Sequence, residues 1–422
     1  MINLKDNSKI FVICISILVF SSFAYSFIVG EDALGGAEQD FIMNNKFLLN
    51  FSENFKLTIQ AYGVYGYEVR NLPVFNIILA QFLNLGLKIS HLKYLNLLVL
   101  FPIIFYFIKS LKIKYINISF SSQILFVCII LLSPTIRSLV NYPYPFLWAI
   151  CFFIISIFFY LNFQYNKNHK FKNALYCILN LSLASYMTPN FAVFIIFYIF
   201  KFFLEYKISK KFLKICFFSF TLSLPALFFL IWKDFYFFKN EVFEVSYLEK
   251  FNIANKIIII SSFITLYFIP FMIKLTKKDI FSKLTISKNL LYILSFFVIS
   301  IFFFNFKNGA GGGIFYQTSN IIFGNNYFLY LVFLISLLIF SFFKFYNYEN
   351  FLIFLILILY NPQYTIYYKY FDPLLLFVFL FIFNIKKNKA HDINVISKKY
   401  FIFYMVFLLL NIYKYDLRLL LI

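Results

Sequence analysis

The chain has 422 residues, of which 62% are hydrophobic and only 13% are charged. A water-soluble core of this size has no use for so large an apolar share, and apolar runs long enough to cross a bilayer recur from end to end. The formal net charge of +21 comes largely from lysines clustered between these runs, which is how membrane topology is encoded. We therefore expect an all-α polytopic membrane protein with no nucleic-acid partner.

The first apolar run, residues 10–29, predicts an uncleaved span with its N-terminus in the cytoplasm. The polar segment that follows, residues 30–72, is then extracytoplasmic, and it contains Glu31, Asp32, Glu38, Asp40, Glu53 and Glu68. A carboxylate at the rim of a membrane is costly to ionise, so it tends to serve a function. We expect a functional role for Asp40, and we interpret Glu31, Asp32 and Glu53 as ordinary polar loop residues.

The next apolar run, residues 73–87, is only marginally long enough to cross a bilayer. Lysines at 109–114 indicate a cytoplasmic loop, and one crossing, residues 93–108, already separates them from the extracytoplasmic segment. Residues 73–87 are therefore expected to form a juxtamembrane or re-entrant helix.

The remaining apolar runs predict about thirteen crossings in one polytopic domain, residues 1–422, of the inner (cell) membrane. After the first span, crossings are expected at 93–108, 118–135, 146–163, 173–187, 189–205, 212–232, 254–273, 289–306, 326–344, 350–361, 372–385 and 400–414. The glycine-rich segment 309–313 is expected to be a flexible outer loop with no helix N-terminus after it. The tyrosine-rich segment 364–370 is typical of an interfacial aromatic belt.

Cysteine and arginine are both informative. The cysteines at 14, 128, 151, 177 and 216 lie within apolar runs without metal-ligand spacing, so neither a disulfide nor a zinc framework is expected. Only three of the 38 basic residues are arginine, and two of them, Arg70 and Arg137, lie in segments predicted to face outward. Arginine binds phosphate oxygens through two parallel hydrogen bonds, and Lys369 adds a third outward cation. The alternative for each is snorkelling to the membrane interface.

Three segments resemble the membrane-embedded GT-C glycosyltransferases, a superfamily that includes protein O-mannosyltransferases, aminoarabinose transferases and oligosaccharyltransferases. Glu38-Gln39-Asp40-Phe41 is similar to the acidic position that follows the first span there. Residues 70–79 resemble the His-Pro-Pro-Leu segment, without its His and first Pro, and residues 131–134 resemble the end of the third or fourth span. Residues 369–373 are a weaker likeness to an Arg-Tyr pair before a late span.

The resemblance implies an enzyme that transfers a sugar from a polyprenyl-phosphate-linked donor to a glycan or lipid acceptor of the cell envelope, on the extracytoplasmic face. Such a transfer needs a base at the acceptor hydroxyl and cations at the departing phosphate. Asp40 is then the expected base and Glu38 the second carboxylate, whereas Arg70, Arg137 and Lys369 are the expected phosphate ligands. No cofactor is predicted, and a divalent metal has no support because the second outer loop lacks an acidic pair.

Two alternatives remain open. An O-antigen or capsule polymerase has a similar size and span count, but such proteins commonly carry their largest polar loop late in the chain. A transporter or flippase is expected to have ionisable residues inside its spans and repeated halves, and neither is evident in the sequence.

Overall fold

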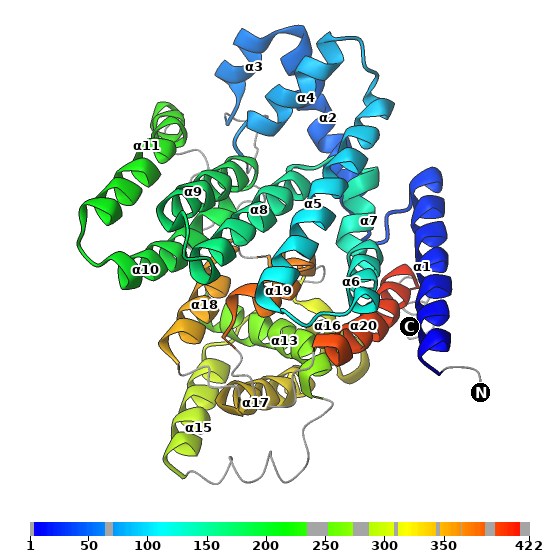
Figure 1. Ribbon diagram of the computed structural model, residues 1–422, viewed down its shortest axis with the longest axis vertical. Coiled ribbons are helices and arrows are strands. Elements are labelled where there is room, and N and C mark those ends of the chain that lie inside the picture. The colour runs from blue at the N-terminus through cyan, green and yellow to red at the C-terminus, as the bar shows by residue number, and fades with distance from the viewer. Residues whose placement is uncertain are drawn as a thin grey trace. The chain divides into compact units, whose positions relative to one another are not determined.

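The computed structural model describes residues 4–63, 71–233, 252–272, 287–307, 311–342, 347–363, 365–384 and 393–413, which contain helices and no strand (Figure 1). The chain divides into two compact units. Unit 1 comprises Met1–Leu248 with Tyr404–Ile412, and unit 2 comprises Glu249–Phe403 with Tyr413–Ile422. The single domain expected from the sequence stays a prediction.

Unit 1 holds the first eleven α-helices of the chain and its first two 3-10 helices. Their bounds are α1 Leu4–Val29, α2 Ala37–Glu53, α3 Phe55–Ala61, α4 Val74–Asn84, η1 Ile89–His91, α5 Leu92–Lys114, α6 Phe120–Leu132, α7 Pro134–Asn141, α8 Pro145–Tyr165, α9 Lys170–Met187, η2 Pro189–Phe194, α10 Ile195–Tyr206 and α11 Lys210–Trp232. α8 contributes the largest number of buried residues among them, and it packs against α5 and α9.

Unit 2 is built around α13, which is buried along most of its length. The bounds are α13 Ile253–Met272, α15 Ser287–Phe302, α16 Gly313–Phe323, α17 Tyr327–Phe342, α18 Tyr348–Leu359, η3 Tyr368–Tyr370, α19 Leu374–Phe377 and a π-helical turn η4 Val378–Ile382. The last helix of the described residues, α20 Ile393–Ile412, begins in unit 2 and ends in unit 1.

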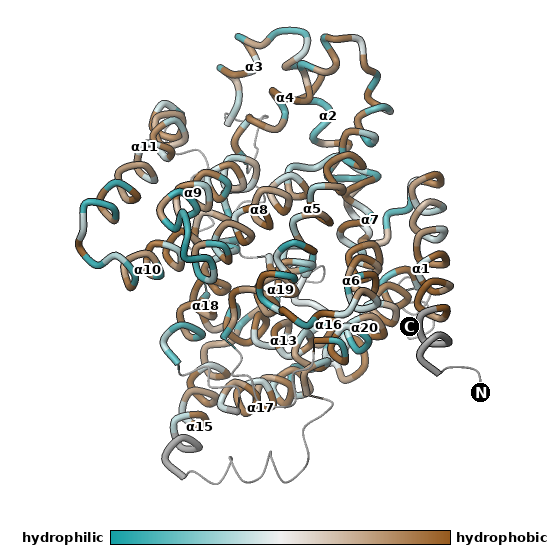
Figure 2. The backbone as a smooth tube through the Cα atoms, viewed as in Figure 1, coloured by the Kyte–Doolittle hydropathy of each residue, from teal (hydrophilic) through white to brown (hydrophobic). Residues whose placement is uncertain are grey.

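Seven helices of the described chain are long and apolar enough to cross a membrane, and the bent pair α6–α7 makes a possible eighth. The seven are Ile10–Val29, Ile89–Lys114, Pro145–Tyr165, Pro189–Tyr206, Lys210–Trp232, Ile253–Met272 and Ile393–Ile412. Figure 2 shows apolar residues running along α1 and α6. The helical, polytopic membrane character is therefore confirmed, whereas the count of about thirteen crossings stays a prediction.

The polar segment after the first span is folded into helices. α2 and α3 occupy much of it, and α2 packs on α4 around a buried cluster of Phe51, Tyr62 and Ala80. The Tyr62 hydroxyl donates to the Asn71 carbonyl at 2.8 Å, which connects the residue after α3 to the stretch just before α4. α4 has 11 residues and is about 16 Å long, so it is too short to cross a bilayer core of ~30 Å. In Figure 1, α2, α3 and α4 are grouped together beyond one end of α8.

The glycine-rich segment differs from the expectation. Residues 308–310 lie outside the described structure, but Gly312 adopts a left-handed conformation with φ of 85° and α16 begins at the next residue. The expectation that no helix follows this segment was wrong. Gly313 is required sterically, since a Cβ atom there would lie 2.0 Å from the Phe263 ring.

Candidate functional site

A broken helix in unit 1 positions the polar junction between α1 and α2. α6 and α7 are bent by 60° on either side of Ser133, because Pro134 has no N–H and its ring blocks a continuous helix. The Ser133 hydroxyl accepts a hydrogen bond from the Ile136 N–H at 3.2 Å and so caps α7. Every residue of α7 is buried, so its polar side chains serve neighbouring elements rather than solvent.

Arg137 of α7 is inside the protein, with only 2% of its surface exposed. Its guanidinium donates to the Glu31 carboxylate at 3.2 Å, to the Ser22 hydroxyl at 2.7 Å and to the Leu131 carbonyl at 3.2 Å. The Leu131 carbonyl loses its regular helical partner at the Ser133 break, and a cation is a good replacement. Arg137 therefore joins α1, the junction and the broken span, and it does not snorkel to an interface.

Three further side chains from α7 and its C-terminus hold the same junction. The bonds join the Leu34 N–H to the Ser138 hydroxyl (2.8 Å), the Asn141 amide to the Glu31 carbonyl (2.9 Å) and the Tyr142 hydroxyl to the Gly30 carbonyl (2.7 Å). α7 in turn is held by α5, because the buried Asn96 amide donates to the Leu139 carbonyl at 2.7 Å. The junction is thus fixed from several sides.

Asp32 fixes the start of α2. Its carboxylate accepts hydrogen bonds from the N–H groups of Gly35 (2.9 Å), Gly36 (2.6 Å) and Glu38 (3.2 Å), at the positive end of the helix dipole. Burial raises the pKa of this carboxyl, but the bonds from Gly36, Glu38, Ser138 and Gly35 outweigh burial, so the pKa lies below its ordinary value of 3.8. Asp32 is ionised at neutral pH and anchors the helix.

The predicted catalytic carboxylates, Glu38 and Asp40, lie in the first turn of α2. Glu38 is exposed and Asp40 is partly buried, because residues two apart on a helix point about 200° apart. Tyr142 lies beside this turn, with its ring 6.3 Å from that of Phe41. Burial raises the pKa of the Tyr142 hydroxyl, and the negative charges of Glu38 and Asp32 raise it further. Both carboxylates thus stand on a helix with an anchored start.

Of the three predicted phosphate ligands, Arg137 lies at this junction, with Glu31 as its anionic partner. Arg70 lies outside the described residues. Lys369 belongs to unit 2, where its Nζ lies 5.5 Å from the centre of the Tyr367 ring and 5.6 Å from that of Tyr370.

Metal ligation has no visible basis in the part of the chain that the structure describes. No three His, Cys, Asp or Glu side chains come together there in a way that would hold an ion. The five cysteines are free, and Cys128, Cys151 and Cys177 are buried in unit 1.

Sequence reasoning missed the roles of Glu31 and Asp32, which were interpreted as ordinary polar residues. An aspartate three residues before a Gly-Gly pair and a helix start is a signal for a side chain that caps backbone N–H groups. The sequence also indicated that Arg137 has an anionic partner, since a cation in an apolar run usually pairs with a carboxylate. The pairing across more than a hundred residues could not be read from spacing.

Unit 2 contains a buried cation that sequence reasoning also missed. Lys256, near the start of α13, has 1% of its surface exposed. Its ammonium donates to the carbonyls of Asn361 and Gln363, the latter at 2.9 Å. These carbonyls follow the end of α18, where the backbone is not helical. Non-helical backbone inside a membrane protein needs such partners, because no water is available to it.

A carboxylate is buried farther along the same helix. Asp372 is fully buried, and the Tyr267 hydroxyl of α13 donates to it at 2.8 Å. Tyr267 follows Lys256 by eleven positions, or about three turns and ~16 Å of helix, so the two side chains lie on one face. Between them, Phe263 packs on the rings of Tyr368 and Phe371. This face of α13 therefore contacts the segment from Asn361 to Asp372 at several points along its length.

Comparisons with known proteins give no family for this chain. No protein-family model matches the sequence, and neither a curated protein nor a solved structure matches it. The function therefore has to be argued from the residues and contacts described above.

Proposed function

We propose that the protein is a glycosyltransferase that moves a sugar from a polyprenyl-phosphate-linked donor to a glycan or lipid acceptor on the extracytoplasmic face. The observation that carries the proposal is the position of Glu38 and Asp40 in the first turn of α2, whose start is held by Asp32. A general base acts well only when it is held at a constant position near the proton it accepts.

The two carboxylates of this turn differ in burial. Asp40 is partly buried, which limits its solvation, whereas Glu38 is exposed. The proposal therefore assigns the base to Asp40 and the second, weaker role to Glu38.

The phosphate of the donor is assigned to Arg70, Arg137 and Lys369, with one condition for Arg137. Its guanidinium is bonded to Glu31, so a phosphate has to replace that carboxylate as the anionic partner. Arg70→Ala is then expected to weaken donor binding without loss of folding, by the roughly 1.5–3 kcal/mol of a charge-assisted hydrogen bond. Unchanged donor kinetics in this variant would remove Arg70 from the proposal.

The decisive experiment measures the release of polyprenyl phosphate from a panel of labelled lipid-linked sugars by purified protein. Asp40→Asn keeps the shape and hydrogen-bonding capacity of the side chain but removes its basicity. Turnover should fall by about 10²–10⁴-fold, the usual effect of losing a general base. Glu38→Gln should have a smaller effect.

Glu53→Gln is the matched control, because Glu53 is exposed and lies at the other end of α2. It removes the same charge from the same helix and should leave turnover unchanged. If Asp40→Asn, Glu38→Gln and the double variant all retain normal transfer, the first turn of α2 is not the catalytic centre and the proposal fails.

A second candidate, a transporter or flippase, is favoured by one observation in unit 2. Lys256 and Asp372 are ionisable and buried along α13, a helix long and apolar enough to cross a membrane. Ionisable residues at such positions commonly mark ion or substrate pathways. The polymerase alternative gains no comparable observation from the described residues.

This candidate is tested by lipid movement rather than by transfer. Protein in vesicles should expose a fluorescent polyprenyl-phosphate lipid of the inner leaflet to an impermeant quencher, and Asp372→Asn should slow that exposure. Protein-free vesicles and the Asp40→Asn variant serve as controls. Equal rates with and without protein would exclude flipping of this lipid.

A further inference from the structure

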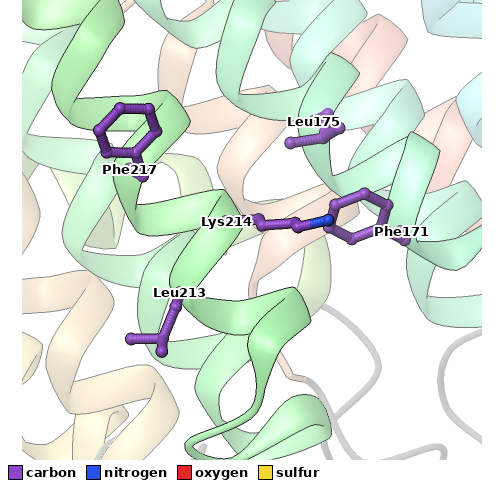
Figure 3. Close-up of a pocket in the computed structure, with 5 residues that line it drawn as sticks. All are labelled: Phe171, Leu175, Leu213, Lys214 and Phe217. Carbon is purple, nitrogen blue, oxygen red and sulfur yellow. The ribbon is translucent and has the colours of Figure 1, made fainter.

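A surface groove lies between α9 and α11 of unit 1 (Figure 3). Its volume is about 470 Å³, within the ~300–1,000 Å³ typical of small-ligand sites. Phe171 and Leu175 of α9 and Leu213, Lys214 and Phe217 of α11 line it, and the Lys214 chain extends toward Phe171. Four apolar walls and one ammonium suit a ligand with a long apolar part and a negatively charged end.

The α11 side of the groove is apolar and uncovered within unit 1. Ile215 is the one buried residue that the 23-residue α11 contains in the described structure, and Leu213 and Phe217 are 57% and 72% exposed. α11 is long and apolar enough to cross a membrane. Lipid chains are the surroundings that such a face meets in a bilayer.

The positive charge at the N-terminal end of α11 favours the binding of an anion. Lys210, Lys211 and Lys214 are exposed in its first two turns, at the positive end of the helix dipole, where cations are unfavourable. Residues 166–233 contain a single acidic residue, Glu205, and it is paired with Lys170. Among the residues that the structure describes, no carboxylate forms an ion pair with the three lysines of α11.

We propose that this groove binds an anionic phospholipid, with an acyl chain against Phe171, Leu175 and Phe217 and the phosphate at Lys210, Lys211 and Lys214. A zwitterionic lipid fills the same apolar space but brings no net negative charge. Loops rich in lysine are typically cytoplasmic, so we expect the start of α11 to face the cytoplasm. The predicted position of α2 is on the opposite side of the membrane. The site is therefore separate from the proposed glycosyl transfer.

The experiment offers purified full-length protein equal amounts of phosphatidylglycerol and phosphatidylcholine with the same acyl chains, and counts retained lipids by native mass spectrometry. The wild type should retain phosphatidylglycerol preferentially. Each lysine near an anionic headgroup is worth roughly a fivefold preference. The triple variant Lys210→Gln, Lys211→Gln, Lys214→Gln should therefore have a preference for phosphatidylglycerol that is about a hundredfold weaker.

Two further variants separate this groove from general surface charge. Lys109→Gln, Lys112→Gln, Lys114→Gln removes the same charge from the C-terminal end of α5, and it should keep the preference. Leu175→Trp fills the groove and keeps every lysine, and it should reduce retention. Size-exclusion profiles establish that each variant is folded.

Four results would overturn the proposal. The first is equal retention of the two phospholipids by the wild type. The second is an equal loss of preference in the α5 triple variant, and the third is full retention of lipid by Leu175→Trp. The fourth is displacement of phosphatidylglycerol by polyprenyl phosphate at a much lower concentration, since this would make the carrier lipid the occupant.

Discussion

The ion pair between Arg137 and Glu31 predicts a measurable coupling in stability. Arg137→Met removes three hydrogen bonds and leaves a carboxylate without its cation, and breaking a buried pair in this way costs about 3–5 kcal/mol. Glu31 is 23% exposed, so water offsets part of this loss and the lower end applies. Glu31→Gln keeps a hydrogen-bond acceptor but leaves the guanidinium, which is only 2% exposed, without its carboxylate, so it should also cost about 3–5 kcal/mol. The double variant leaves no unpaired charge, so its cost should fall short of the sum by about 1–2 kcal/mol.

The buried thiols of unit 1 supply the assay. Cys128, Cys151 and Cys177 are free and buried, so a thiol-reactive dye labels them only as the unit opens during heating. The four proteins of the cycle are compared by the midpoint of labelling under identical conditions. Additive losses would show that the two side chains act independently, and a loss below 1 kcal/mol for Arg137→Met would refute the bracing role.

Three other predictions concern Asp32, Lys256 and Gly313. Because the folded pKa of Asp32 lies below 3.8, its contribution to the free energy of unfolding is full above that pH and is lost as pH falls through the folded pKa. Between about pH 2 and 4, the stability of the wild type should therefore fall more steeply with decreasing pH than that of Asp32→Asn. Lys256→Met should remove a donor from two buried carbonyls, at a cost of about 1–3 kcal/mol each. Amide exchange at Asn361 and Gln363 should then rise, whereas Lys256→Arg should restore part of the protection. Gly313→Ala should lower the free energy of unfolding by about 2–4 kcal/mol, because φ is 74° and the new Cβ would clash with Phe263. Gly324→Ala should lower it by only about 1–2 kcal/mol, because φ is 63° but no atom lies within 4 Å of the new Cβ. Similar losses in both variants would contradict the steric argument.

The helical membrane character could be predicted from the sequence because the bilayer requires long apolar runs, and such runs are visible directly. The length of α4 followed from the same reasoning, since the run at 73–87 is short. The helical fold of the polar segment was harder to see. α2 is amphipathic and only partly apolar, and its packing on α4 depends on Phe51 and Tyr62, which meet only after the chain has turned.

Less of the candidate site than of the membrane fold could be predicted from the sequence. The carboxylates could be singled out from their place after the first span, but their partners could not. Arg137 reaches Glu31 across 106 positions because Pro134 breaks the span and turns α7 toward the junction. Lys256 likewise looks like a residue at the end of an apolar run, and only its contacts with Asn361 and Gln363 reveal a buried cation. Long-range polar pairs depend on tertiary geometry, which local patterns do not contain.

The acidic residues of the junction divide into two groups with different physical roles, and this division has a consequence for the proposed activity. Glu31 and Asp32 are bonded to Arg137 and to backbone N–H groups, so they hold α2 in place. Glu38 and Asp40 stand on the helix that those bonds hold. Substituting the first pair should therefore lower stability and transfer together, whereas Asp40→Asn should lower transfer by more than its change in stability accounts for. A plot of transfer against unfolding midpoint for these variants should place Asp40→Asn well below the line formed by the others. If all variants fell on one line, Asp40 would be one more structural residue, and the base would have to be sought elsewhere in the chain.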